Sequence, residues 1–147
     1  MSIHQITNHH LSIKDIKEII DSKAILELSK KAKAKIEQCR KYLDDKLNNS
    51  DDLFYGINTG FGSLCDIAIS KEETSQLQYN LVVSHACGTG NLIPKEIVKI
   101  MLFLKIQSLS FGHSGISKEV AQRLVDMFNA DVLPVIYELG SLGASGD

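Results

Sequence analysis

The sequence predicts an all-α protein whose helices are joined by long glycine-rich loops. Two observations favour this fold class. Apolar residues recur at steps of three or four along several segments, as they do on one face of a helix, and capping residues precede these segments. No segment shows the alternation typical of a half-buried strand. The 147 residues, 44% of them hydrophobic, suffice for one domain with a packed core.

Two helices are predicted before residue 50. Ser12 is placed to cap a short helix, and Asp15 stands at its third helical position, as in a capping box. The residues expected on its apolar side are Ile13, Ile16, Ile19 and Ile20. A longer amphipathic helix is predicted from Ala24 to about Leu47, where the sequence NNSDD ends it. Its apolar stripe comprises Ile25, Leu28, Ala32, Ile36, Cys39, Leu43 and Leu47.

Three further helices follow. Ser70 and Glu73 form a second capping-box pattern, which predicts a helix through about Val83. A helix from Pro94 to about Leu109 is the most apolar stretch, so we expect it to be buried. Ser117 is placed to cap the last helix, whose inward side is expected to carry Val120, Leu124 and Phe128.

The composition argues against several classes of protein. The net charge is −2, and the lysines of the first fifty residues alternate with acids, which favours a solvated helix face over a nucleic-acid or membrane surface. The start of the chain is polar, and the longest apolar run, Ile100–Leu104, is too short to span a bilayer, so a cytoplasmic location is expected. The cysteines Cys39, Cys65 and Cys87 lack metal-binding spacing and are expected to be reduced, with no metal site.

Two glycine-rich loops carry candidate functional side chains. The first, at 55–62, reads Tyr-Gly-Ile-Asn-Thr-Gly-Phe-Gly, and no lysine follows its glycines as in a phosphate-binding loop. The alternative to a functional role is a tight loop in which Tyr55 is a half-buried anchor. The second loop, at 80–90, reads Asn-Leu-Val-Val-Ser-His-Ala-Cys-Gly-Thr-Gly, and His85 in it also fits a satisfied polar group.

The third loop, at 140–147, contains the tripeptide Ala144-Ser145-Gly146. In a tightly bent backbone, the amide nitrogen of Gly146 can attack the carbonyl carbon of Ala144, since glycine leaves this nitrogen unhindered. Loss of one water closes an imidazolone ring, and loss of the Ser145 hydroxyl as a second water leaves an exocyclic methylidene. The product is an electrophile that no encoded side chain supplies. The tripeptide alone also fits a flexible turn.

Taken together, the three loops resemble those of the aromatic amino acid ammonia-lyases, in the same order and rough spacing, and the segment Phe-Gly-His-Ser-Gly at 111–115 fits as well. The resemblance is closest to the histidine ammonia-lyases. It implies an all-α, tetrameric enzyme several-fold longer than this chain. Residues 1–147 would then be the N-terminal segment, ending at the cofactor-forming loop, and inactive when isolated. Lys105 and His113 depart from the family, since many members have Arg and Tyr there.

By this resemblance, Ala144, Ser145 and Gly146 form a 4-methylidene-imidazol-5-one group autocatalytically, without an external cofactor. Such an electrophile captures the substrate, which makes loss of a poor amine leaving group feasible. Tyr55 would be the base that removes a β-proton. Free tyrosine has a pKa of about 10, so this role requires a lowered pKa, for which helix N-termini or cations are the available causes.

The resemblance also assigns substrate-binding residues. Gly62 would line the site near the reacting end of the substrate. Ser84 and His85 occupy the pair that tracks substrate choice, and Ser-His is the histidine-type pair, whereas tyrosine-specific members have His-Leu and phenylalanine-specific ones tend to have Phe-Leu. The expected reaction is elimination of ammonia from L-histidine to give trans-urocanate. The alternatives are a tyrosine or phenylalanine lyase or aminomutase, and a non-catalytic helical interaction module if 147 residues is the natural length.

Overall fold

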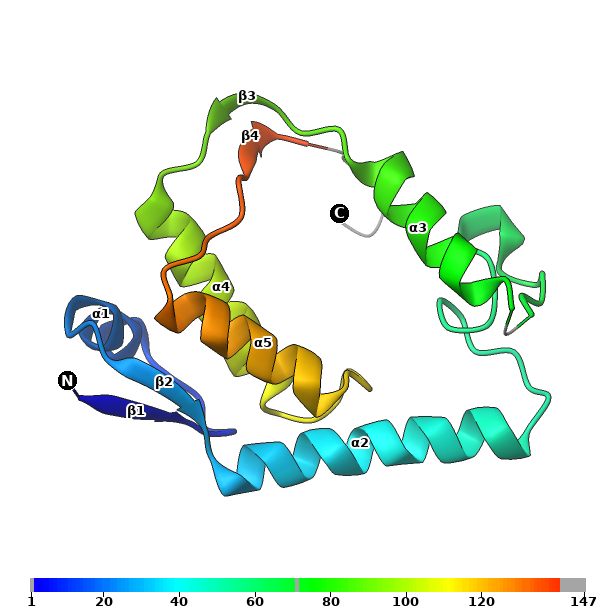
Figure 1. Cartoon of the computed structure of the whole chain (residues 1–147), viewed down its shortest axis with the longest axis horizontal. Helices are drawn as coiled ribbons and strands as arrows, with labels where there is room; N and C mark the ends of the chain where they lie inside the picture. The colour runs from blue at the N-terminus through cyan, green and yellow to red at the C-terminus, as the bar shows by residue number, and fades with distance from the viewer. Residues whose placement is uncertain (1, 71, 141–147) are drawn as a thin grey trace. The chain divides into compact units, whose positions relative to one another are not determined.

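The computed structural model describes residues 2–70 and 72–140, which Figure 1 draws in colour. They form two compact units. The first unit comprises Met1–Asn48 and Ile93–Val135, and the second comprises Asn49–Leu92 and Ile136–Asp147. Helices predominate in the described residues, which confirms the predicted class in outline, but short strands occur as well. Strands of three or four residues are too short to produce a recognisable alternation in the sequence.

The first unit begins with a strand, a helix and a second strand. Strand β1 (Ile3–Ile6) pairs in parallel with β2 (Ile25–Leu28), and helix α1 (Ile13–Asp21) lies in the connection between them (Figure 1). The predicted capping box is confirmed, since the Asp15 N–H donates to Ser12 Oγ at 3.2 Å and the Ser12 N–H donates to the Asp15 carboxylate at 2.7 Å. The Ser12 hydroxyl also donates to the Asp15 carboxylate at 2.7 Å, and this bond, together with the one from the Ser12 N–H, lowers the pKa of Asp15.

The prediction for the apolar side of α1 is correct except for the first residue of the helix. Ile16, Ile19 and Ile20 pack against the core. Ile13 is 88% exposed, so its predicted place is wrong. It is the first residue of the helix, and the packing of α1 against the core begins one turn later, at Ile16.

The helix predicted from Ala24 to Leu47 is wrong in its first part. Ile25–Leu28 form β2, and helix α2 runs over Lys30–Asn49. In β2, Leu26 and Leu28 are buried while Glu27 between them is exposed, which is the alternation of a strand. This alternation spans too few residues to be separated from a helical period in the sequence. The prediction is confirmed for Ala32 and Ile36, which are buried on α2, whereas Cys39, Leu43 and Leu47 are only partly buried.

Helices α4 (Lys95–Leu109) and α5 (Lys118–Asn129) occur where they were predicted. Ser117 Oγ accepts the Val120 N–H, as its predicted capping role requires. The inward face of α5 carries Ala121, Val125 and Phe128. Val120 is 48% exposed, so its predicted inward position is wrong, because the buried face starts one residue later.

The core of the first unit surrounds Phe103 on α4. Its side chain is completely buried, and its ring centroid lies 6.2 Å from that of Phe128 and 6.2 Å from that of His4. Burial lowers the pKa of His4, because desolvation disfavours the charged imidazolium. The other buried apolar residues of this cluster come from both strands and from α2, α4 and α5: Ile6, Leu26, Leu28, Ile36, Leu102, Ile106, Ala121 and Val125.

Polar side chains fasten distant backbone segments to this core. Gln107 Nε2 donates to the carbonyl oxygens of Thr7 at 2.7 Å and His9 at 3.0 Å. Asn129, at the end of α5, pairs with both backbone groups of Leu26: its Oδ1 accepts the Leu26 N–H at 2.8 Å, and its Nδ2 donates to the Leu26 carbonyl at 2.9 Å. The segments joined are about a hundred residues apart, so these bonds stabilise the fold rather than a local turn.

The turn between α4 and α5 lies close against α2. Gly112 has φ +72°, and a Cβ at this position would come within 2.7 Å of the Lys35 carbonyl oxygen. Gly115 likewise approaches Leu43, and Arg40 Nη1 donates to the Gly115 carbonyl at 3.3 Å. Glycine at 112 therefore meets two requirements at once, a left-handed backbone and space for α2.

We predict that Asn129→Ala lowers the free energy of unfolding by about 2 kcal/mol, because it leaves two backbone groups of the buried Leu26 without partners. Urea denaturation measures this change. Gln122→Ala on the same helix is the matched control, since the Gln122 amide bonds only to the exposed Asp126. The control should alter stability by less than about 0.5 kcal/mol. Equal losses in the two variants would contradict the role given to Asn129.

Candidate functional site

The second unit contains the candidate residues that the structure describes: Tyr55, Gly62, Ser84 and His85. Ala144, Ser145 and Gly146 lie outside the described residues. The four described candidates form two local pairs, one in the loop before helix α3 (Thr74–His85) and one at the end of that helix. In the described part of the chain, no hydrogen bond or ring contact joins one pair to the other.

The loop over residues 54–69 is neither a regular helix nor a strand, as its glycines predicted, apart from the short 3-10 helix η1 (Gly62–Leu64). Asn58 organises this loop: its Oδ1 accepts the Phe54 N–H at 2.6 Å, its Nδ2 donates to the Asp52 carbonyl at 2.9 Å, and its own carbonyl accepts the Ile69 N–H at 2.9 Å. Side chains of this type often replace backbone partners in turns. We did not single out Asn58 from the sequence, although an asparagine beside glycines in a loop is a signal for this role.

Tyr55 and Gly62 are brought together by the fold of this loop. The Gly62 N–H donates to Tyr55 Oη at 3.3 Å, and the Phe61 ring packs edge-on against the Tyr55 ring, with centroids 5.9 Å apart. Tyr55 is 64% exposed, so the alternative of a half-buried anchor is wrong. The Tyr55 phenol oxygen accepts a hydrogen bond from one N–H group, and a second lone pair is still available to accept a proton.

Glycine at position 62 is required by its backbone conformation. Its φ is +57°, in the left-handed region, and no atom of the described residues lies within 4 Å of the place where a Cβ would be. An alanine side chain at position 62 would therefore meet no other group of the described residues. The exposure of Tyr55 itself is what leaves its phenol oxygen accessible to a small molecule.

Helix α3 begins close to the predicted place and ends two residues after it. Ser70 Oγ accepts the Glu73 N–H at 3.3 Å and donates to the Glu73 carboxylate at 3.0 Å, so the predicted Ser70–Glu73 pair forms just before the helix. None of the twelve residues of α3 is buried within the described structure. Tyr79, Val82 and Val83 are exposed apolar side chains on it.

Ser84 and His85, in the last turn of α3, both turn back onto one carbonyl group. Ser84 Oγ donates to the Leu81 carbonyl oxygen at 3.0 Å, and His85 Nδ1 lies 2.8 Å from the same oxygen. Ser84 Oγ is also 3.1 Å from His85 Nδ1. The sequence indicated the two side chains, but the carbonyl that holds them belongs to the backbone and carries no sequence signal.

A two-stranded sheet connects the second glycine loop to the start of the third. Strand β3 (Thr89–Leu92) pairs antiparallel with β4 (Tyr137–Leu139), with Thr89 opposite Leu139 (Figure 1). A Cβ at Gly88 would approach the Tyr137 ring to 2.9 Å, so the two segments are in close contact. The sequence analysis predicted neither strand.

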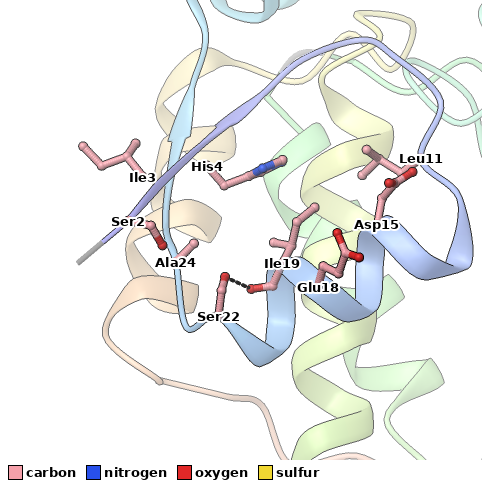
Figure 2. A pocket seen from close by; sticks show the side chains of 9 residues that line it. All are labelled: Ser2, Ile3, His4, Leu11, Asp15, Glu18, Ile19, Ser22 and Ala24. Carbon is pink, nitrogen blue, oxygen red and sulfur yellow. Dashed lines mark hydrogen bonds between the residues drawn. The ribbon is translucent and has the colours of Figure 1, made fainter.

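A surface pocket in the first unit contains none of the candidate residues. Figure 2 shows its lining: Ser2, Ile3, His4, Leu11, Asp15, Glu18, Ile19, Ser22 and Ala24. Its polar side chains are largely engaged within the chain. The Asp15 carboxylate accepts from Ser12, and Ser22 Oγ donates to the Ile19 carbonyl at 2.9 Å. These bonds cap the two ends of α1, so the polar side chains that make them stabilise this helix.

The described residues contain neither a metal-binding cluster nor a membrane-spanning helix. Over residues 2–70 and 72–140, no three His, Cys, Asp or Glu side chains are grouped so that they could hold a metal ion. Over the same ranges, no helix combines the length and the apolar character needed to cross a membrane. All three cysteines are free thiols.

Known proteins are similar to this chain over almost its whole length. The family model described as "Aromatic amino acid lyase" matches residues 11–147. Histidine ammonia-lyase from Alkaliphilus oremlandii is 43% identical over 142 residues, 97% of this chain and 28% of that protein. The enzyme of the same name from Streptococcus gordonii is 41% identical over 138 residues, 94% of this chain and 27% of that protein. The chain thus spans little more than a quarter of the length of these relatives.

A solved structure supports the same comparison. The crystal structure of histidine ammonia-lyase from Trypanosoma cruzi superposes with a TM-score of 0.82 at 33% identity, covering 97% of this chain and 27% of that one. The similarity therefore extends over most of both units.

We predict that Gly60→Ala disrupts the loop around Tyr55 more than Gly62→Ala does. A Cβ at residue 60 would lie 2.7 Å from Leu64 Cβ and 2.8 Å from the Leu64 carbonyl oxygen, so the backbone has to move, at a cost of roughly 2 kcal/mol. At Gly62 only the left-handed backbone opposes alanine, which costs about 1 kcal/mol.

Amide hydrogen exchange provides a local measurement. The amides of Ile67 and Ile69, which bond to the Leu64 and Asn58 carbonyls, should exchange about thirtyfold faster in Gly60→Ala and about fivefold faster in Gly62→Ala. The reverse order of the two variants would show that the contact of Gly60 with Leu64 does not hold this loop.

Proposed function

Because this chain belongs to the aromatic amino acid lyase family, we propose that the full-length protein eliminates ammonia from L-histidine and releases trans-urocanate. The structural observation that carries the proposal is the β3–β4 pairing, which links the loop after His85 to the segment before Ala-Ser-Gly. The histidine ammonia-lyases at 41% and 43% identity support histidine as the substrate. We further propose that residues 1–147 are the N-terminal segment of the enzyme.

The β3–β4 pairing supports this proposal by limiting the distance between the candidate groups. His85 precedes Thr89 by four residues, and an extended chain of that length spans at most about 14 Å. Ser145 follows Leu139, the partner of Thr89, by six residues, which spans at most about 21 Å. Both residues thus lie within six residues, along the sequence, of the same pair of strands.

In the proposed reaction, Tyr55 accepts the β-proton of the substrate on its phenol oxygen. The exposure of Tyr55 supports access of a substrate to this oxygen. The Gly62 N–H places the positive end of its dipole on Tyr55 Oη, where negative charge resides when tyrosine acts as a base. Gly62 itself lines the site next to the reacting end of the substrate.

Ala144, Ser145 and Gly146 have the chemistry that formation of 4-methylidene-imidazol-5-one requires: an unhindered glycine nitrogen, an uncrowded alanine carbonyl and a serine hydroxyl to be lost. The group supplies an electrophile for the capture of the substrate. No external cofactor is part of the proposal. His85 binds the aromatic ring of the substrate, and Ser84 beside it helps to orient that ring.

The proposal favours histidine over the alternatives considered from the sequence. A tyrosine or phenylalanine lyase or aminomutase is less supported, because the relatives at 41% and 43% identity are named histidine ammonia-lyases. A non-catalytic helical module is disfavoured by the match to the lyase family over residues 11–147. A homotetramer and a cytoplasmic location complete the proposal.

We predict that the full-length protein releases ammonia from L-histidine, and that Ser145→Ala abolishes nearly all of this turnover because the electrophile cannot form. An absorbance assay for urocanate, run beside assays with tyrosine and phenylalanine, measures the activity. Intact mass spectrometry of wild type should show a loss equal to two waters, and the variant should lack this loss. Wild-type turnover in Ser145→Ala would contradict the role of the tripeptide. Ammonia release from none of the three amino acids would refute the proposed reaction.

We predict separately that Tyr55→Phe slows elimination about 10²- to 10⁴-fold, the range expected when a general base is removed. The mass deficit of two waters should persist in this variant, because Tyr55 is not part of the tripeptide. This combination distinguishes loss of the base from loss of the electrophile. A variant with unchanged kcat would exclude Tyr55 as the base.

A further inference from the structure

The contacts of His85 specify which of its ring nitrogens carries the proton. A carbonyl oxygen can only accept a hydrogen bond, so the 2.8 Å contact between His85 Nδ1 and the Leu81 oxygen requires a proton on Nδ1. If Nδ1 carried no proton, its lone pair would face a lone pair of the Leu81 oxygen at this distance, which is unfavourable. A neutral imidazole has a single N–H, so Nε2 is then an acceptor.

Ser84 completes this arrangement. Its hydroxyl has one proton, which it donates to the Leu81 carbonyl at 3.0 Å. Its oxygen therefore has lone pairs directed elsewhere, and His85 Nδ1 lies 3.1 Å away. The Nδ1–H is thus shared between two acceptors, the Leu81 carbonyl and Ser84 Oγ, which restrains both the tautomer and the orientation of the ring.

We propose that Ser84 is a positioning residue, which together with the Leu81 carbonyl holds His85 in the Nδ1–H tautomer and so presents Nε2 as a hydrogen-bond acceptor to the substrate ring. This inference rests on the proposed function, in which His85 binds that ring. It defines the polarity of the interaction: the substrate ring has to offer a hydrogen-bond donor. The neutral imidazole of L-histidine has one, whereas the phenyl ring of phenylalanine has none and leaves the acceptor unpaired.

The tautomer can be observed directly by ¹⁵N NMR of the full-length protein labelled at histidine nitrogens. Signals of His85 are those missing from a His85→Gln variant. We expect a proton attached to Nδ1 and none on Nε2. A proton on Nε2 in the wild type would overturn the proposal.

Substitutions of Ser84 test its part. Ser84→Ala removes one acceptor of the Nδ1–H, so signals of the second tautomer should appear, and kcat/KM for L-histidine should fall about fivefold. Ser84→Thr is the matched control, because it keeps the hydroxyl and threonine in a helix can bond a carbonyl one turn earlier. It should restore both the spectrum and the rate. If Ser84→Ala left both unchanged, Ser84 would have no positioning role.

The outcomes separate this inference from the proposed function. Release of ammonia from histidine by a protein whose His85 carries its proton on Nε2 would refute the inference and leave the function standing. The Nδ1–H tautomer in a protein that does not act on histidine would refute the function, and with it the statement about substrate, while the tautomer assignment would stand.

Discussion

The burial of helix α4 is the constraint on which the first unit depends. A helix whose apolar residues include Val98, Leu102, Phe103 and Ile106 has to be covered on more than one side. Strands β1 and β2 and helices α2 and α5 contribute residues to the same core. The polar side chain of Gln107 is buried with them because its amide satisfies two backbone carbonyls of the segment after β1.

The second unit is held together in a different way. Helix α3 has no buried residue within the described structure, so hydrophobic burial contributes little to its position there. The loop at 54–69 depends instead on hydrogen bonds that Asn58 and Thr59 make with nearby backbone groups. Hydrogen bonds fix directions as well as distances, which suits the roles proposed for the Tyr55 phenol oxygen and the His85 imidazole ring.

The comparison of sequence with structure shows which kinds of information are local. The helix starts at Ser12 and Ser117 could be predicted, because a capping side chain and the amide it binds are three residues apart. The strands could not be predicted, because their stability comes from partners far along the chain: Leu26 depends on β1 and on Asn129.

The candidate site follows the same rule. Tyr55, Gly62, Ser84 and His85 were indicated by the resemblance of their loop motifs to those of the ammonia-lyases. The Gly62 N–H and the Leu81 carbonyl were not, because every residue carries the same backbone groups and only the fold determines which of them a side chain meets.

The pairing of Asn129 with Leu26 has a consequence for association between molecules. The outer edge of a β-strand offers unpaired N–H and C=O groups, to which a strand from another chain can add. At Leu26 the amide of Asn129 occupies both groups, as a neighbouring strand would. A side chain at the end of a helix thus closes the centre of this edge of the two-stranded sheet, and the sheet is protected from growing by recruitment of further strands.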